Sequence, residues 1–120
     1  MSDSNGKRRS EKVVAIGSSV MGRGSNELGT KLMANFLRKL WASPARPTTI
    51  VFYNSGVNLL VAGAEGTEAI AGLASAGVDI VACGTCVNYY GIAERMAAGR
   101  VSDMQEIVSL LLEAETTITV

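Results

Sequence analysis

The sequence predicts an α/β fold: a three-layer α/β/α domain with a mostly parallel sheet of about four or five strands. Short runs rich in β-branched residues alternate along the chain with segments of helical periodicity. These runs are continuously apolar, which is typical of strands that are buried on both faces. With 120 residues, the chain has room for one ordinary domain.

The chain divides into a polar tail, residues 1–11, and one domain, residues 12–120. The tail carries Lys7, Arg8 and Arg9, but the apolar run that follows is too short for a secretory signal, and we expect the tail to be disordered. No apolar run approaches the roughly 20 residues that cross a bilayer. We therefore expect a cytoplasmic protein without a membrane partner.

The first part of the domain is predicted to form a strand and a helix. The β-branched run 13–16 is the first expected strand, and a glycine and two serines follow it. Apolar residues then recur at helical spacing over residues 28–41, with Ser25 or Asn26 as a candidate N-cap. The segment 43–47 ends this helix, because its two prolines cannot continue the hydrogen-bond ladder.

The middle of the domain continues the alternation. The β-branched and aromatic run 48–53 is the second expected strand. Residues 57–65 fit either a helical turn or a packed loop. A short helix is expected over residues 67–76, with Gly77 in the left-handed conformation that ends many helices. The apolar run 78–82 is the third expected strand.

The last part of the domain is predicted to hold helical turns, a helix and a strand. Residues 92–97 have enough apolar positions for one or two helical turns. Ser102 and Gln105 fit a capping box that opens a further helix. Residues 116–120 alternate between polar and apolar side chains and are expected to form a last strand at an edge of the sheet.

The composition excludes several classes of function. Eleven basic and eleven acidic residues give a net charge of zero, whereas nucleic-acid binding needs a basic surplus, so we expect no nucleic-acid partner. The chain contains no histidine. Catalytic triads of the Ser-His or Cys-His kind and histidine-containing metal sites are therefore excluded.

The two cysteines of the chain, Cys83 and Cys86, stand in a CxxC spacing directly after the third expected strand. The N–H groups of Gly84 and Thr85, and the dipole of a helix that begins there, are expected to stabilise a sulfur anion. Thiolate is the nucleophile in persulfide and disulfide exchange.

Two other interpretations of this pair remain open. Cys83 can be a small buried core residue without chemistry. A zinc site needs four ligands, so the pair would have to share the metal with another chain. We expect neither a metal nor a cofactor.

Three loops are expected to meet at the cysteines. Residues 17–25, 54–58 and 83–91 each follow the carboxyl end of an expected strand. In open parallel sheets these ends share one edge, and that edge is where sites form.

Five further residues of these loops are candidates for lining the site. Arg23 would add positive charge near the sulfur if its side chain points inward. Asn54, Ser55 and Gly56 form either a simple turn or a polar wall. Tyr89 is a packing residue or a wall of the site.

Four segments of the sequence form a joint pattern that is more specific than a CxxC motif alone. They are MGRG with a following LG at 21–29, FYNSGV at 52–57, CGTCVNYYG at 83–91, and DM with a following isoleucine at 103–107. This pattern resembles the DsrE-like domain of YedF-type proteins, which are sulfurtransferase-like and linked to selenium metabolism. The resemblance covers roughly residues 12–120. It implies a parallel sheet of about five strands covered on both faces, a cysteine that carries persulfide sulfur in a relay, and assembly into oligomers.

The resemblance also implies roles for single residues. By its distance from Gly91, Cys83 matches the sulfur-accepting cysteine of the family. Many relatives have arginine at the position of Tyr90, whereas YedF-like members, like this chain, have tyrosine there. YedF-type proteins usually carry an amino-terminal TusA-like domain, whereas this chain has only a short tail there. The resemblance therefore implies a TusA-like donor or acceptor protein in trans, and a homo-oligomer.

Three functions compete on these grounds. The first, which we expect, is a sulfur or selenium relay protein in which Cys83 attacks a donor persulfide and Cys86 releases or resolves it. The second is a dithiol redox protein that cycles between thiol and disulfide. The third is a non-catalytic oligomeric interaction subunit, whose cysteines would be alkylated no faster than a free thiol with a pKa of about 8.5.

Overall fold

The computed structural model describes residues 11–120. They contain one five-stranded sheet in the order β4-β3-β2-β1-β5, and every neighbouring pair is parallel. The predicted α/β fold class is confirmed. The strands are β1 (Lys12–Ile16), β2 (Thr49–Phe52), β3 (Asp79–Cys83), β4 (Arg100–Ser102) and β5 (Thr116–Thr119). The helices are α2 (Asn26–Ala42), α3 (Thr67–Ser75), α4 (Gly84–Tyr90) and α5 (Met104–Glu113), with two 3₁₀ turns, η1 (Asn54–Leu60) and η2 (Ala93–Arg95). The expected tail lies outside the described residues, except for Glu11.

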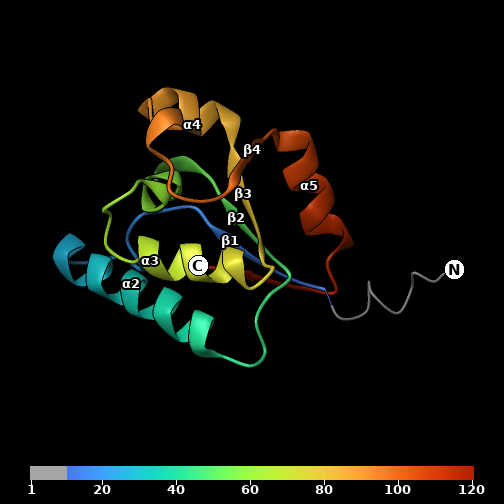
Figure 1. Ribbon diagram of the computed structural model, residues 1–120, viewed down its shortest axis with the longest axis horizontal. Coiled ribbons are helices and arrows are strands. Elements are labelled where there is room, and N and C mark those ends of the chain that lie inside the picture. The colour runs from blue at the N-terminus through green and yellow to red at the C-terminus, as the bar shows by residue number, and fades with distance from the viewer. Residues whose placement is uncertain (1–10) are drawn as a thin grey trace, which may run out of the picture.

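The helices cover both faces of the sheet (Figure 1). Helices α2 and α3 lie together on one face, and α5 lies on the other. The strand order explains this arrangement, because β1 to β4 advance across the sheet in one direction and the chain then returns past β1 to form β5. Right-handed crossovers in opposite directions place their helices on opposite faces.

Alternate residues of β1, β2 and β3 supply the two cores. Val14, Ile50 and Ile80 belong to the core under α2 and α3. Val51 and Val81 belong to the smaller core under α5. These three strands are therefore buried on both faces, as their continuous apolar runs predicted, whereas the edge strands β4 and β5 are largely exposed.

Helix α2 begins where its sequence predicted. The hydroxyl of Ser25 accepts a hydrogen bond from the N–H of Leu28 at 3.1 Å, which confirms Ser25 as the N-cap. Gly77 also has the predicted left-handed conformation after α3, with φ of 100°. Of the ambiguous stretch 57–65, residues 57–60 belong to η1, and residues 61–65 are a bridge residue followed by turns.

Two expectations for the last part of the chain are wrong in detail. The cap of α5 is Asp103 rather than Ser102: its carboxylate accepts a hydrogen bond from the N–H of Glu106 at 2.9 Å. Ser102 instead belongs to β4 and pairs with Cys83. Strand β4 itself was not predicted. Of the one or two helical turns expected over residues 92–97, the structure contains the three-residue 3₁₀ turn η2.

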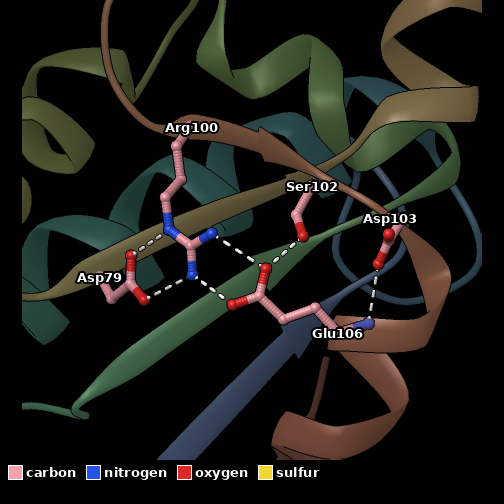
Figure 2. A network of polar contacts seen from close by, with 5 residues as sticks. All are labelled: Asp79, Arg100, Ser102, Asp103 and Glu106. Carbon is pink, nitrogen blue, oxygen red and sulfur yellow. Dashed lines mark hydrogen bonds and ion pairs between the residues drawn. The ribbon is translucent and has the colours of Figure 1, made fainter.

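An ion-pair network connects the edge strand β4 to β3 and to α5 (Figure 2). The guanidinium of Arg100 lies 3.0 Å from Asp79 at the start of β3 and 2.6 Å from Glu106 in the first turn of α5. The hydroxyl of Ser102 also donates to the Glu106 carboxylate. Hydrogen bonds from Arg100 and then from Ser102 lower the pKa of Glu106 to about 2. The network joins the amino end of α5 to β4 and to the start of β3.

Within residues 11–120, no helix combines the length and the hydropathy needed to cross a membrane.

Candidate functional site

The three predicted loops meet at the carboxyl edge of the sheet. The N–H of Ser19, after β1, donates to the hydroxyl oxygen of Ser55 at 3.1 Å. The N–H of Asn54, after β2, donates to the Sγ atom of Cys86 in α4 at 3.0 Å. Gly56 lies directly against the carbonyl of Ile16, where a Cβ atom has no room. Two hydrogen bonds and one close backbone contact thus join the ends of β1, β2 and β3.

The CxxC segment passes from strand to helix without a connecting loop. Cys83 is the last residue of β3 and the N-cap of α4. A side chain at Gly84 would place its Cβ atom 2.9 Å from the carbonyl oxygen of Ser102, so glycine allows α4 to begin against β4. The chain can therefore turn sharply at this point and bring Cys86 back over the edge of the sheet.

The two cysteines are free and lie in different surroundings. Cys83 is only 2% exposed and belongs to the apolar core of Val51, Val81 and Ile107. Cys86 is partly exposed and packs at the margin of both cores. Of the two thiols, Cys86 is the one that the surroundings leave accessible.

Cys86 opens onto a cavity of about 410 Å³. Its walls come from the end of β2, the start of η1, α4 and the first residue of α5, and they are Tyr53, Asn54, Thr85, Cys86, Tyr89, Tyr90 and Met104. The rings of Tyr89 and Tyr90 meet edge to face with centroids 5.0 Å apart. None of these lining residues is charged, so the cavity suits an uncharged or protein-borne group better than a small anion.

The surroundings of the Cys86 thiol raise its pKa on balance. Burial raises its pKa, and a side-chain hydrogen bond with Cys83 acts in the same direction. The hydrogen bond from the Asn54 N–H opposes both, because it favours the anion. The resting site therefore holds a thiol whose anion already has one amide partner.

The structure separates the sequence candidates into three groups. Four of them line the cavity: Asn54, Thr85, Cys86 and Tyr89. Four others lie beside it and shape the backbone or the core: Ser55, Gly56, Cys83 and Gly84. The remaining candidate, Arg23, is exposed in the loop between β1 and α2 and is not one of the lining residues.

The expected donors to sulfur were the amides of Gly84 and Thr85. Among the described residues, the main-chain amide that donates to a cysteine sulfur belongs to Asn54. Sequence reasoning did not assign Tyr53, Tyr90 or Met104 to the site. The position of Tyr53 after a strand end was the available signal, whereas Met104 enters only through the packing of α5. Within residues 11–120, no group of three or more Cys, Asp or Glu residues is arranged to hold a metal ion.

Solved structures share this fold. A protein of unknown function from Methanobacterium thermoautotrophicum, MTH1491, is 23% identical with a TM-score of 0.66, and the match covers 92% of this chain and 98% of that one. The ychN protein from E. coli is 14% identical with a TM-score of 0.69, covering 92% and 99%. BT1422 from Bacteroides thetaiotaomicron, also of unknown function, is 15% identical with a TM-score of 0.65, covering 92% and 95%. At these identities the likeness shows the fold alone.

The sequence itself identifies the family. A comparison with curated proteins finds no match for the chain. The profile of the DsrE/DsrF-like family, however, matches residues 12–120, which is the whole expected domain. The chain therefore belongs to the DsrE/DsrF-like family.

Proposed function

We propose that this chain is a sulfur relay protein that holds a persulfide on its CxxC pair and passes the sulfur to a partner protein. The DsrE/DsrF-like family is associated with sulfur relay. Cys83 matches the accepting cysteine of the family, and Cys86 is the second thiol of the same site. The observation that carries the proposal is the partly exposed Cys86 Sγ, which has a main-chain amide partner, borders a cavity and lies beside a second thiol.

The chemistry needs only thiols. A thiol of the pair attacks the outer sulfur of a donor persulfide, a new S–S bond forms, and the donor leaves as its thiol. The reverse step delivers the sulfur, because an acceptor thiol attacks the outer sulfur of the loaded cysteine and regenerates the free pair. No net oxidation occurs, so neither step needs a redox cofactor.

The YedF-type subgroup and its cargo are part of the proposal. The FYNSGV and CGTCVNYYG segments support the subgroup. A cysteine thiol that takes up sulfur is also chemically able to take up selenium, so both elements are candidate cargoes. The proposed compartment is the reducing cytoplasm, where the pair stays as free thiols.

We propose a TusA-like protein as donor or acceptor, and a homo-oligomer as the working form. Proteins of this family generally act in sulfur-relay complexes. The uncharged walls of the cavity support a persulfide delivered on a protein surface. Helix α5 supports association, because Val108 is 45% exposed and Leu112 is 80% exposed.

Exposure to a persulfide donor tests the proposal. The protein is mixed with glutathione persulfide or with inorganic polysulfide, passed through a desalting column, and its intact mass is measured. In samples taken soon after mixing, before Cys83 can resolve the persulfide, we expect the wild type to gain the mass of one sulfur atom and to lose it on reduction. The Cys83→Ala/Cys86→Ala double variant is the matched control and should gain nothing. A wild type that gains no sulfur from either donor contradicts the proposal.

A second candidate function is dithiol–disulfide exchange. The influence of Cys83 on the pKa of Cys86 favours it, because neighbouring free thiols are candidates for a disulfide. The reduction potential of the pair, measured in glutathione buffers, distinguishes the two functions. A pair that equilibrates reversibly with glutathione but never gains sulfur mass would favour the redox function.

A further inference from the structure

We propose that Cys86, rather than Cys83, is the thiol that accepts sulfur from the donor, and that Cys83 resolves the resulting persulfide. This inference rests on the proposed function and assigns an order to its two thiols. It reverses the order that the family resemblance implies.

Access is the first observation behind this order. A donor sulfur must approach the attacking thiol closely, and a donor carried on a protein needs open space around that thiol. Cys83 is 2% exposed and packs against Val51, Val81 and Ile107. Cys86 is a wall of the 410 Å³ cavity, and Cys83 is not. A donor that enters the cavity therefore meets Cys86 first.

The amide of Asn54 is the second observation. It lies 3.0 Å from the Cys86 Sγ, at the exposed side of the site. Asn54 has φ of 50° and is the one non-glycine residue with positive φ within residues 11–120. Asparagine adopts this left-handed conformation more readily than most residues, and non-glycine residues held in it often lie at functional sites. Here the unusual backbone directs an N–H group at one sulfur, and that sulfur belongs to Cys86.

The steps balance without an external oxidant. In the first step, Cys86–SH attacks the outer sulfur of a donor R–S–SH, which gives Cys86–S–SH and R–SH. Delivery to an acceptor thiol then regenerates Cys86–SH. When no acceptor is bound, Cys83–SH attacks the Cys86 sulfur and forms the Cys83–Cys86 disulfide, while the outer sulfur leaves as H₂S. In that step the Cys83 sulfur is oxidised, the outer sulfur is reduced and the Cys86 sulfur keeps its oxidation state, and a thiol reductant such as glutathione then restores the pair.

Access rather than acidity supports this order at rest. Burial and Cys83 raise the pKa of the resting Cys86 thiol, which lowers the fraction of reactive thiolate. A persulfide is a stronger acid than its parent thiol, and the loaded group is therefore more readily an anion. The Asn54 N–H stabilises that anion.

Loading kinetics of single variants test the order. Wild type, Cys83→Ala and Cys86→Ala are exposed briefly to a small excess of glutathione persulfide, and the added sulfur is followed by intact mass. Alanine is used because a serine at the buried position 83 would leave its hydroxyl unpaired. We expect Cys83→Ala to load no more slowly than the wild type, because loss of Cys83 lowers the pKa of Cys86, and to release no H₂S. Cys86→Ala should load more slowly by about tenfold or more, because its remaining thiol is buried.

The wild-type protein gives a check that does not depend on the folding of any variant. After brief loading, the sample is blocked with an alkylating agent, and fragmentation of the peptide that contains both cysteines locates the added sulfur. Sulfur on Cys86 at the earliest times supports the order. Sulfur first on Cys83, or loading of Cys86→Ala at the wild-type rate, overturns it. A wild type that never loads instead removes the proposed function itself, so the two failures are distinguishable.

Discussion

The N–H of Asn54 lies 3.0 Å from the Sγ atom of Cys86, although 32 residues separate them in the chain. This hydrogen bond joins the segment after β2 to α4, which follows β3. It also distinguishes the two thiols of the CxxC pair, because it gives Cys86 a polar partner at the exposed edge of the sheet. Several properties of the protein depend on this contact and on the backbone that supports it.

The backbone of Asn54 should make the protein sensitive to the residue type at this position. Asparagine and glycine tolerate positive φ, whereas a β-branched residue does not. We expect Asn54→Val to lower the free energy of unfolding by about 1–2 kcal/mol. Asn54→Gly should lie within about 1 kcal/mol of the wild type. Urea denaturation measures both values.

The control for this series is Asn58→Val in the same 3₁₀ turn. Asn58 has ordinary backbone angles, so the same side-chain change there should have a smaller effect. Equal destabilisation by the two valine variants would show that the conformation of Asn54 is not the cause.

Gly84 should resist substitution because of its contact with β4. A Cβ atom at this position would lie 2.9 Å from the carbonyl oxygen of Ser102, and backbone cannot yield as a flexible side chain does. We expect Gly84→Ala to destabilise the protein by about 1–3 kcal/mol, even though alanine is the better helix former. Thr85→Ala, at the exposed next position, should stay within about 0.5 kcal/mol. A Gly84→Ala variant as stable as the wild type in thermal or urea unfolding would contradict the close contact.

The sequence predicted the strands that are completely buried and the helix start that a local hydrogen bond stabilises. The continuous apolar runs marked β1, β2 and β3, and the hydroxyl of Ser25 marked the start of α2. Strand β4 escaped prediction because it has three residues and an exposed face, so pairing with β3 rather than its own composition makes it a strand. Because Ser102 pairs with β3 as part of β4, it does not cap α5, and Asp103 is the N-cap instead.

The sequence predicted where the candidate site lies in the fold, but not all of the residues that line it. The topology of parallel strands brings Asn54 and Cys86 to one edge, and this much followed from the order of elements. The exposure of each thiol did not, because it depends on the packing of Cys83 at the end of β3 under α5 and of Cys86 in the first turn of α4. Met104 reaches the cavity only because α5 packs across the opposite face of the sheet from α2, and no local pattern indicates that contact.

The Arg100–Glu106 ion pair should make the free energy of unfolding depend on pH. The pKa of Glu106 is lowered to about 2 in the folded protein, chiefly by hydrogen bonds from Arg100. Because the folded pKa lies below the unfolded one, the stabilisation is fully present above the unfolded value of about 4.3 and is lost as the pH falls towards 2. We therefore expect Glu106→Gln to be less stable than the wild type at pH 7, and the difference to shrink steadily as the pH falls from about 4.3 to about 2.

Urea unfolding at both pH values measures this dependence. Glu65→Gln, at an exposed position outside the network, is the matched control and should differ little from the wild type at either pH. A destabilisation by Glu106→Gln that persists unchanged near pH 2 would mean that the charge of Glu106 is not what stabilises the fold.

The thiol of Cys86 should ionise less readily than an ordinary cysteine. Burial raises its pKa and Cys83 raises it further, so at pH 7 iodoacetamide should alkylate Cys86 more slowly in the folded protein than in urea. The midpoint of the pH–rate profile should lie above the usual value of about 8.5, and it should move down in Cys83→Ala. Peptide-resolved mass spectrometry follows each cysteine separately. An unchanged midpoint in Cys83→Ala would rule out the coupling between the two thiols.

The mouth of the cavity should control access to Cys86. Met104 is a wall of the cavity and is 51% exposed, so Met104→Trp should fill part of the space without disturbing the buried core. We expect this variant to slow the reaction of Cys86 with the bulky reagent dithiobis(nitrobenzoate) by about tenfold. The reaction of Cys86 with the smaller iodoacetamide should be slowed less. Leu112→Trp is the matched control, because Leu112 lies on the same helix, is 80% exposed and does not line the cavity. If both tryptophan variants slow the bulky reagent equally, the reagent does not reach Cys86 through this cavity, and the proposed route of the sulfur donor falls with it.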